Sequence, residues 1–375
     1  MRVLISGGGT SGHVNPAIAI ANELRERDKN IQVAFAGTEK GIENKLVPRE
    51  GYKLYHLKVK GFKRKLSLEN IDALIKAFTS QITAKKIIRD FHPDIVIGTG
   101  GYVSWPVLSC AAKMKIPTII HEQNAFPGVT TKMLAKVVDV TMISFEESRR
   151  YFKEKDNLVY TGNPVRREFF NVDHKMAKKD LSPGKPMILS YGGSMGAHKM
   201  NEVIIGFMDE FSKKKNVTHY HATGSLGYKE FNELFNDKGL DVYKNLFLSE
   251  YLFDIHKYMA AADIIICRAG ALTLAELAII KKPAILVPSP YVTENHQYKN
   301  AAVLEKAGAA IIIEEKDLTI EALALKVDEF VSDPLKISDM ARNISKYAPN
   351  GALDNICDIV MQTTKKHKKY NSEKG

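Results

Sequence analysis

The sequence has few of the features that mark secreted or membrane-spanning proteins. Its three cysteines, Cys110, Cys267 and Cys357, have apolar neighbours and no metal-ligand spacing, so we expect reduced thiols buried in a core. No apolar run approaches the roughly 20 residues that a membrane-spanning helix needs. The apolar run that follows Met1 is too short for a signal peptide. Any membrane contact is therefore expected to be peripheral.

Paired carboxylates and aromatic residues of the kinds that would indicate metal or nucleic-acid binding are also scarce. No D-x-D sequence occurs, although transferases that hold Mg²⁺ or Mn²⁺ on a diphosphate commonly use one, so we expect no obligatory metal and no cofactor. Basic residues outnumber acidic ones by 54 to 43, a formal charge of +11 that suits nucleic acid, a phosphate-bearing substrate or an acidic lipid surface. With a single Trp and no recognisable nucleic-acid-binding module, nucleic acid is the least favoured of the three.

Short apolar runs alternate with amphipathic stretches, a pattern typical of a mostly parallel α/β sheet. A strand over 3–6 and a glycine turn over 7–13 precede a helix that we expect to start at Asn15-Pro16. The same order begins again with a strand over 187–191, a turn over 192–197 and a helix over 201–211. Further strands are expected over 33–36, 95–98, 118–121, 264–267 and 284–287.

The length of 375 residues and the two strand–glycine turn–helix segments predict an α/β protein of two Rossmann-like domains, each with a doubly wound parallel sheet. The segment 162–164, Gly-Asn-Pro, is the expected junction between them. We predict an N-terminal domain over 1–163, a C-terminal domain over 164–350, a helix over 351–364 that packs back on the first domain, and a disordered basic tail over 365–375.

The first glycine turn matches G-x-G-x-x-G through Gly7, Gly9 and Gly12. In dinucleotide-binding enzymes these glycines let a helix N-terminus face a pyrophosphate, and Glu39 could supply the acidic ribose partner. A nicotinamide-dependent oxidoreductase is therefore an alternative on this motif alone. His13 is either a loop histidine satisfied by the backbone or a general base, since neutral imidazole accepts a proton near neutral pH.

The second glycine turn, over 192–197, opens a helix whose N-terminus could hold a diphosphate, but it is not a Walker A loop. The alternative is a simple tight turn. In the later run from Arg268 to Glu276, Glu276 could accept both hydroxyls of a ribose. Thr273 and Glu276 also have the T-x-x-E spacing of a helix capping box, so a purely structural role stays open.

Seven segments in register resemble glycosyltransferase family 28: residues 8–13, 100–104, 121–124, 162–166, 192–197, 267–276 and 297–301. The resemblance covers nearly the whole chain, to about residue 360. It implies the GT-B fold, in which two Rossmann-like domains face a cleft. It also implies transfer of N-acetylglucosamine from UDP-N-acetylglucosamine to the muramyl sugar of a lipid-linked muramyl-pentapeptide acceptor, in peptidoglycan synthesis. A UDP-sugar epimerase of similar architecture is the alternative.

The resemblance also implies roles for individual residues. His13 is the expected catalytic base, with Glu122 in reserve, and Arg166 and Ser194 meet the diphosphate. The remaining donor residues surround the uracil, ribose, diphosphate or sugar: Leu252, Ala271, Leu272, Thr273, Leu274, Ala275, Glu276 and Gln297. The acceptor side is lined by Thr10, Ser11, Gly12, Tyr102 and Asn124. The family usually has Gly where this chain has Ser11, and often Gln where it has His296.

A basic run over 58–66 contains five Lys or Arg residues and Phe62, and the stretch that follows, to Ile82, has apolar residues at helical spacing. Basic side chains near anionic lipid each contribute about 1 kcal/mol. We therefore expect the cytoplasmic face of the cell membrane as the location, with the protein bound peripherally to an anionic bilayer. An ordinary solvated loop before a core-facing helix is the alternative.

Overall fold

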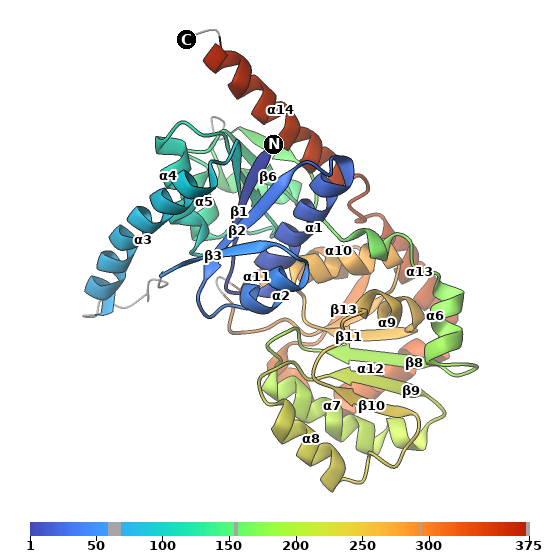
Figure 1. Cartoon of the computed structure of the whole chain (residues 1–375). Coiled ribbons are helices and arrows are strands. Elements are labelled where there is room, and N and C mark those ends of the chain that lie inside the picture. The colour runs from blue at the N-terminus through green and yellow to red at the C-terminus, as the bar shows by residue number, and fades with distance from the viewer. Residues whose placement is uncertain (59–68, 154–156, 293–294, 373–375) are drawn as a thin grey trace. The chain divides into compact units, whose positions relative to one another are not determined.

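The computed structural model describes residues 1–58, 69–153, 157–292 and 295–372, and for 69–79, 331, 334 and 368–372 it describes the backbone alone. The chain divides into two compact units (Figure 1). Unit 1 comprises Met1–Val165 and Pro349–Gly375, and unit 2 comprises Arg166–Ala348. The divisions fall two residues away from the boundaries that the sequence predicts.

Unit 1 is built on a parallel sheet whose seven strands, within the described residues, lie in the order β3-β2-β1-β4-β5-β6-β7. The direction of winding reverses between β1 and β4, which is the topological switch point of a Rossmann-like sheet. The strands are β1 (Arg2–Gly7), β2 (Gln32–Thr38), β3 (Lys53–Leu57), β4 (Ile95–Gly100), β5 (Thr118–Glu122), β6 (Val140–Ile143) and β7 (Leu158–Tyr160).

Helices cover both faces of this sheet: α1 (Ser11–Arg27), α2 (Glu43–Arg49), α3 (Glu69–Phe91), α4 (Ser104–Lys113), α5 (Val129–Leu134), the 3-10 helix η1 (Glu146–Tyr151) and α14 (Ala352–Ser372). Alternate residues of β1 therefore point to different cores. Val3 and Ile5 pack with α1 and α14, whereas Leu4 packs with α3 and α4. Burial on both faces explains why the strands read as continuous apolar runs.

Helix α1 begins four residues earlier than the sequence predicts. Its N-cap is Thr10, and Pro16 lies inside the helix at its sixth residue rather than in its first turn. Pro16 lacks an N–H, so the carbonyl of Gly12 receives no intrahelical bond from it. The expected start at Asn15-Pro16 was wrong, and the correction places His13 on the helix rather than in the turn before it.

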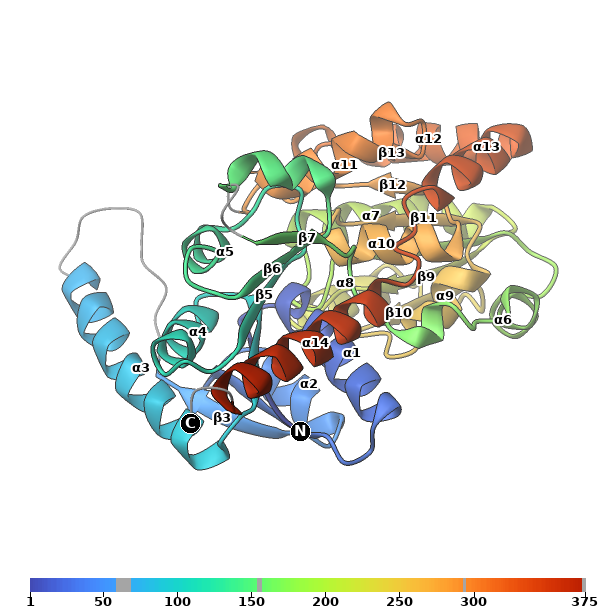
Figure 2. The ribbon, with the colours of Figure 1, turned by 90° about the horizontal axis from the view of Figure 1, so that it is seen from above.

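Helix α14 lies beside α1 in both views of the ribbon (Figures 1 and 2). Ile356, Cys357 and Val360 are buried with α1 and the sheet, and Arg27 pairs with Asp354 and Asp358 at 2.6 Å each. The helix continues to Ser372, so the disordered tail expected from residue 365 was a wrong prediction. Lysine is a good helix former, and its charge is favourable at a helix C-terminus, so a basic tail can extend a docked helix.

Unit 2 repeats the arrangement, with the described strands in the order β10-β9-β8-β11-β12-β13. Its switch point lies between β8 and β11. The strands are β8 (Met187–Tyr191), β9 (Thr218–Ala222), β10 (Leu246–Ser249), β11 (Ile264–Cys267), β12 (Ala284–Leu286) and β13 (Ala310–Ile312).

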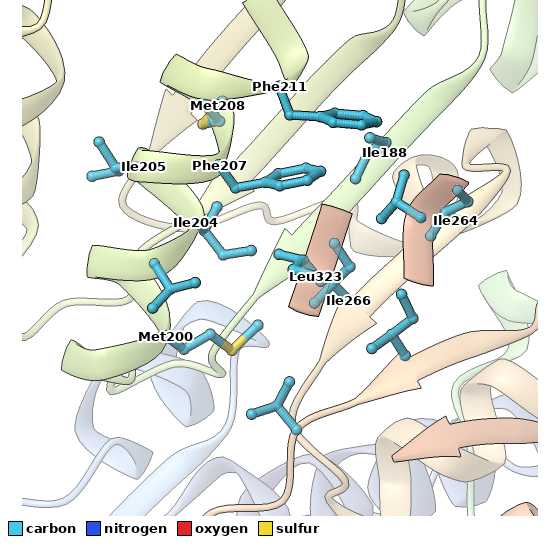
Figure 3. Close-up of a cluster of buried hydrophobic side chains, with 14 of the residues drawn as sticks. Ile188, Met200, Ile204, Ile205, Phe207, Met208, Phe211, Ile264, Ile266 and Leu323 are labelled. Carbon is cyan, nitrogen blue, oxygen red and sulfur yellow. The ribbon is translucent and has the colours of Figure 1, made fainter. Parts of the chain in front are cut away.

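The helices of unit 2 are η3 (Arg167–Phe169), α6 (His174–Leu181), α7 (His198–Glu210), η4 (Ser212–Lys214), α8 (Tyr228–Asp237), α9 (Ile255–Ala261), α10 (Ala271–Ile280), α11 (His296–Lys306), η6 (Glu315–Asp317), α12 (Ile320–Ser332) and α13 (Pro334–Ser345). Helix α7 contributes much of the main core of the unit, together with residues of the sheet and of α12 (Figure 3). Phe207 stacks on Phe211 with ring centroids 4.7 Å apart, and both pack near Ile188 and Leu323.

The three cysteines are buried and unpaired, as the sequence predicts. Burial raises the pKa of the Cys267 and Cys357 thiols to about 12. Thiolate, the reactive form, is therefore strongly disfavoured at both positions. No helix among the described residues is long and apolar enough to cross a membrane.

Three fully buried histidines, His121, His219 and His221, make the fold sensitive to acid, and burial lowers the pKa of His219 well below its ordinary value. His121 on β5 and His221 on β9 are desolvated, which lowers the pKa of each to about 4. The Nδ1–H of His221 donates to the carbonyl of Ser190 at 3.1 Å. An unfolded histidine titrates near 6.5, so between that pH and about 4 the unfolded chain binds protons that the folded chain does not.

We predict that the free energy of unfolding is fully retained above pH 6.5 and declines as the pH falls toward 4. His121 and His221 should each account for about 2 kcal/mol at pH 5, and His219 adds to the same loss. Denaturant unfolding at pH 7.5 and pH 5 measures this loss. His221→Asn, whose amide can replace the Nδ1–H donor, should reduce the pH dependence of unit 2. An equal dependence in the parent and this variant would contradict the assignment.

Candidate functional site

The first glycine turn lies at the switch point of unit 1, between the carboxyl ends of β1 and β4. Strand β1 ends at Gly7, and the hydroxyl of Thr99 on β4 donates to the carbonyl of His13 at 2.7 Å. A Cβ on Gly7 would collide with this hydroxyl. The turn and the end of β4 are therefore packed too closely for a side chain between them.

His13 is the third residue of α1, and its ring is anchored at one nitrogen. Nδ1 lies 3.0 Å from the carbonyl oxygen of Thr99. A carbonyl can only accept, so Nδ1 carries the proton and Nε2 of the neutral ring carries the lone pair. The backbone therefore satisfies Nδ1, and Nε2 is left as the acceptor atom of the ring, so both interpretations of His13 stay open.

The imidazole of His13 can lie here only because residue 100 is glycine. Gly100 has a φ of +103°, and a Cβ there would stand 2.7 Å from Nδ1 of His13. The next residue, Gly101, has a φ of +78°, and a Cβ there would collide with the carbonyl of Gly8. The sequence segment 100–104 is thus brought against the first turn.

The buried carboxylate of Glu43, which the sequence did not predict, stabilises the same turn. Glu43, the first residue of α2, accepts from the N–H of Gly9 at 3.0 Å and from the N–H and hydroxyl of Thr38 at 2.7 and 2.6 Å. Glu43 is 0% exposed. The nearby Glu39, the residue expected to bind a ribose in a dinucleotide enzyme, is exposed just after β2.

The other predicted residues of unit 1 lie around the ends of β4 and β5. Tyr102 is exposed, with its ring edge 3.6 Å from the Cβ position of Gly9. Glu122 is 2% exposed and accepts from the backbone and side-chain amides of Asn124 and from the N–H of Gly128, each at 3.0 Å. Its carboxylate therefore organises the loop after β5.

The second glycine turn lies at the switch point of unit 2, where α7 begins at His198 with Ala197 as its N-cap. Gly196 and Gly224 pack backbone against backbone, because a Cβ on either would collide with the other turn. The N–H of Ser225 donates to the carbonyl of Ser194 at 3.0 Å. The helix N-terminus and half-buried Ser194 are thereby fixed beside the loop after β9.

Arg268, directly after β11, has a structural role. Its guanidinium donates to the carbonyls of Val287 and Pro288 at 3.1 and 3.2 Å and forms a buried ion pair with Glu315. These contacts tie the ends of β11 and β12 to the loop after β13. Arg268 is thereby anchored three residues before α10 begins at Ala271.

The capping-box interpretation of Thr273 and Glu276 was wrong. The N-cap of α10 is Gly270, so Thr273 is the third helical residue and Glu276 the sixth. No side chain caps this helix. Desolvation raises the pKa of the Glu276 carboxyl to about 7, and the positive charge of Arg166 acts against that increase. Glu276 and Arg166 are therefore electrostatically coupled within unit 2.

The remaining donor-site candidates differ in what they can offer a ligand. Leu272 and Thr273 are half-buried, whereas Leu252, Ala271, Leu274 and Ala275 are buried. Gln297 on α11 accepts from the N–H of Ser289 at 2.9 Å through Oε1, which directs its amide nitrogen elsewhere. Among the described residues, no group of three or more His, Cys, Asp or Glu side chains is arranged to hold a metal ion.

Two Rossmann-like units, each with a glycine turn and a helix N-terminus at its switch point, have the architecture of GT-B glycosyltransferases. Residues 3–143 match the model of the glycosyltransferase family 28 N-terminal domain, and residues 187–354 match that of its C-terminal domain. The chain belongs to glycosyltransferase family 28.

Similar proteins extend over nearly the whole chain. A relative from Thermoanaerobacter sp. (strain X514) is 47% identical over 97% of this chain and 100% of its own. It is named UDP-N-acetylglucosamine--N-acetylmuramyl-(pentapeptide) pyrophosphoryl-undecaprenol N-acetylglucosamine transferase. A relative with the same name from Clostridioides difficile (strain 630) is 44% identical over 100% of this chain and 92% of its own.

A crystal structure of Acinetobacter baumannii MurG is also similar, with a TM-score of 0.72, 27% identity and coverage of 96% of this chain and 99% of that chain. Family membership answers the question that the first glycine motif left open. The motif belongs to a glycosyltransferase, and neither the oxidoreductase nor the epimerase alternative is supported.

Two glycines near His13 should respond oppositely to alanine. Gly100→Ala should lower the free energy of unfolding of unit 1 by about 1–3 kcal/mol, since alanine is strained at this φ and its Cβ displaces the imidazole. Gly12→Ala, whose Cβ finds only Thr10 Oγ1 at 3.7 Å, should be neutral or stabilising because it lies in helix α1. Denaturant unfolding of both variants measures this contrast. Equal stabilities would contradict the described approach of the ring to Gly100.

Proposed function

We propose that this enzyme transfers N-acetylglucosamine from UDP-N-acetylglucosamine to the 4-hydroxyl of N-acetylmuramic acid in undecaprenyl-pyrophosphoryl-N-acetylmuramyl-pentapeptide. This step completes the lipid-linked disaccharide of peptidoglycan, and so serves cell-wall synthesis, cell shape and division. The observation that carries the proposal is the full-length similarity to relatives that are named for this reaction. The anchored imidazole of His13 supports it with a group suited to the chemistry.

In the proposed mechanism, His13 is the base. The acceptor hydroxyl gives its proton to Nε2 while its oxygen bonds to the anomeric carbon. The bond from that carbon to the β-phosphate oxygen breaks, its electron pair leaves with UDP, and the configuration inverts. The Nδ1 hydrogen bond to Thr99 persists through the reaction, so the ring need not reorient to accept the proton.

His13 is a better base than the reserve candidate Glu122. The carboxylate of Glu122 is buried and already accepts three hydrogen bonds from its own loop. Its oxygens are therefore already engaged by that loop and shielded from an incoming hydroxyl. We assign Glu122 to shaping the loop that carries Asn124, with Thr10, Ser11, Gly12 and Tyr102 lining the acceptor side of unit 1.

Unit 2 is proposed to bind the donor. Its α7 and α10 helices begin beside the switch point, and their unpaired N–H groups and dipoles favour the diphosphate and the charge that develops on departing UDP. Arg166 and Ser194 add a charge and a hydroxyl. Stabilisation of this kind requires no metal, so we expect turnover to continue in excess chelator. Loss of turnover that Mg²⁺ restores would refute that expectation.

Ribose and sugar contacts complete the proposed donor site. Glu276 accepts from the ribose hydroxyls, and its electrostatic coupling to Arg166 supports assigning both residues to the nucleotide site. The amide nitrogen of Gln297, opposite the oxygen fixed by Ser289, donates to the sugar. The uracil is surrounded by Leu252 and by the start of α10, where Ala271, Leu272, Thr273, Leu274 and Ala275 offer backbone and apolar surface.

We propose that unit 1 meets the cytoplasmic face of the cell membrane, where the polyprenyl acceptor lies. The expected basic run falls mainly on 59–68, outside the described residues. Within the described residues, exposed apolar side chains occur on and after α5, at Val129, Met133 and Val137, and on α3 at Ile82. Both helices pack on α4, and exposed lysines flank these side chains. Apolar groups framed by lysines suit a peripheral contact with anionic lipid.

Removing the proposed base should reduce catalysis far more than binding. His13→Ala should lower kcat by about 10²–10⁴-fold, the usual contribution of general base catalysis, while the Kd for UDP stays close to that of the parent. Steady-state transfer rates and calorimetric UDP binding measure the two effects. His56→Ala, an exposed histidine on edge strand β3, is the control. A His13→Ala enzyme within a few-fold of the parent would exclude His13 as the base.

Glu276→Gln should weaken donor binding and leave the fold intact. Loss of charge-assisted hydrogen bonds to the ribose should raise KM for UDP-N-acetylglucosamine by roughly 10–100-fold. The pKa of this carboxyl is higher folded than unfolded, so its charged form opposes folding as the pH rises past 4.5 toward 7. Thermal stability at pH 8 should therefore stay equal or rise. Lower stability with an unchanged KM would instead indicate a structural role.

The membrane contact can be tested on described residues. Met133→Asp combined with Val137→Asp should weaken binding to vesicles that contain anionic phospholipid, because it removes apolar contact and adds negative charge. Vesicle cosedimentation measures the loss. Val242→Asp, at a more exposed valine of unit 2, is the matched control and should bind like the parent. Equal binding by all three proteins would dismiss this surface.

The overall proposal is tested by transfer of radiolabel from UDP-N-acetylglucosamine to a lipid-linked muramyl-pentapeptide acceptor. The expected product is a labelled lipid-linked disaccharide. UDP-N-acetylglucosamine converted to an epimer, with no label in the lipid fraction, would refute the proposal.

A further inference from the structure

A chain of hydrogen bonds runs from His13 into the buried interior of unit 1. Nδ1 of His13 lies 3.3 Å from Oε1 of Gln123, in addition to its contact with Thr99. Nε2 of Gln123 lies 3.0 Å from Nδ1 of His121. Nε2 of His121 lies 3.0 Å from the carbonyl oxygen of Gly162. Two side chains thus link the proposed base to the segment that leads toward unit 2.

The direction of every bond in this chain follows from its two ends. Both ends are backbone carbonyls, of Thr99 and Gly162, which only accept. Nε2 of His121 therefore carries a proton, and Nδ1 of the neutral ring must accept. The amide nitrogen of Gln123 is the donor to that Nδ1, so its oxygen faces the Nδ1–H of His13. Reversing the amide would place its nitrogen against the Nδ1–H of His13, donor against donor. It would also place its oxygen against the lone pair of His121 Nδ1, so that both of these buried acceptors would be unsatisfied.

Burial makes this arrangement rigid. Gln123 is 3% exposed and His121 is 0% exposed. Desolvation lowers the pKa of His121 to about 4, so the ring is neutral at physiological pH and keeps Nδ1 as an acceptor. The side chain of Asn163 donates to the carbonyl of Gln123 at 3.1 Å, and its oxygen accepts from Ser144 at 3.0 Å. Unpaired polar groups at such positions are costly, so one arrangement dominates.

We propose that Gln123 is a positioning residue for the His13 base, and that His121 in turn fixes the Gln123 amide. The Gln123 oxygen holds the imidazole in the plane and tautomer that leave Nε2 unprotonated. The proposal rests on the assignment of His13 as the base. It gives the Gln of the 121–124 segment a role distinct from that of Glu122, because the Glu122 carboxylate accepts from Asn124 and Gly128, whereas the Gln123 oxygen faces His13.

The chain of hydrogen bonds ends at Gly162, whose backbone conformation and surroundings require glycine. Gly162 has a φ of +80°, and a Cβ there would stand 2.9 Å from Cβ of Pro349. Both residues lie within a few positions of the places where the chain passes between the units. The last acceptor in the chain of hydrogen bonds, the carbonyl of Gly162, thus lies at a position where only glycine fits.

The test combines the tautomer of His13 with the kinetics. In protein with ¹⁵N-labelled imidazoles, the His13 signals, assigned by their loss in His13→Gln, should show Nδ1 protonated and Nε2 bare. Gln123→Met keeps the size of the side chain and removes its oxygen and its N–H groups. Its His13 signals should shift toward a mixture of tautomers. Its kcat should fall about 10-fold, the effect of one lost hydrogen bond at a reacting group, with KM for UDP-N-acetylglucosamine unchanged.

Two further variants separate positioning from stability. Gln123→Glu retains an oxygen opposite Nδ1 and should retain the parent tautomer. Ser144→Ala removes a hydroxyl that contacts His121 and Asn163 but not His13, and should leave both the His13 signals and kcat like the parent. A folded Gln123→Met protein with parental His13 signals and kcat would overturn the proposal. The signals require no substrate, so they remain decisive even if the lipid-linked acceptor proves wrong.

Discussion

The hydrogen bond from Nδ1 of His13 to the carbonyl of Thr99 is the interaction on which this account depends. It exists because the Rossmann strand order sets β4 beside β1, so the end of one strand can accept from a helix that follows the other. The ring fits only because Gly100 leaves room for it. Together with the Gln123 oxygen, this backbone acceptor keeps the proton on Nδ1 and leaves Nε2 free to act as the base that we propose.

The two units share one architecture but present different groups at their switch points. In unit 1, the switch point presents an imidazole held by buried neutral partners. In unit 2, it presents two helix N-termini, with Arg166 and Glu276 nearby, in a setting that suits an anion and its ribose. Glycines are needed at both switch points, because the backbones of neighbouring turns approach too closely for a Cβ at Gly101 in unit 1 and at Gly196 in unit 2. Buried hydrogen bonds and ion pairs, such as Glu43 to Gly9 and Arg268 to Glu315, hold these turns in place.

Local patterns predicted the strands well, and strands 187–191 and 264–267 match to the residue. They failed where a competing local signal existed: Pro16 suggested a helix start, and Thr273 with Glu276 imitated a capping box. The partners Thr99 and Gln123 could not be predicted, because they lie 86 and 110 residues from His13 and only the folded sheet brings them together. Glu43 was missed because nothing in its own segment indicates a buried, uncharged surrounding. The roles of the site residues came from the family resemblance rather than from spacing.

The most direct test of the central claim is the position of the proton on His13. Neutron diffraction from deuterium-exchanged crystals at neutral pH locates it. We predict deuterium on Nδ1, directed at the carbonyl of Thr99, and none on Nε2. Deuterium on Nε2, or a ring rotated away from Thr99, would contradict it.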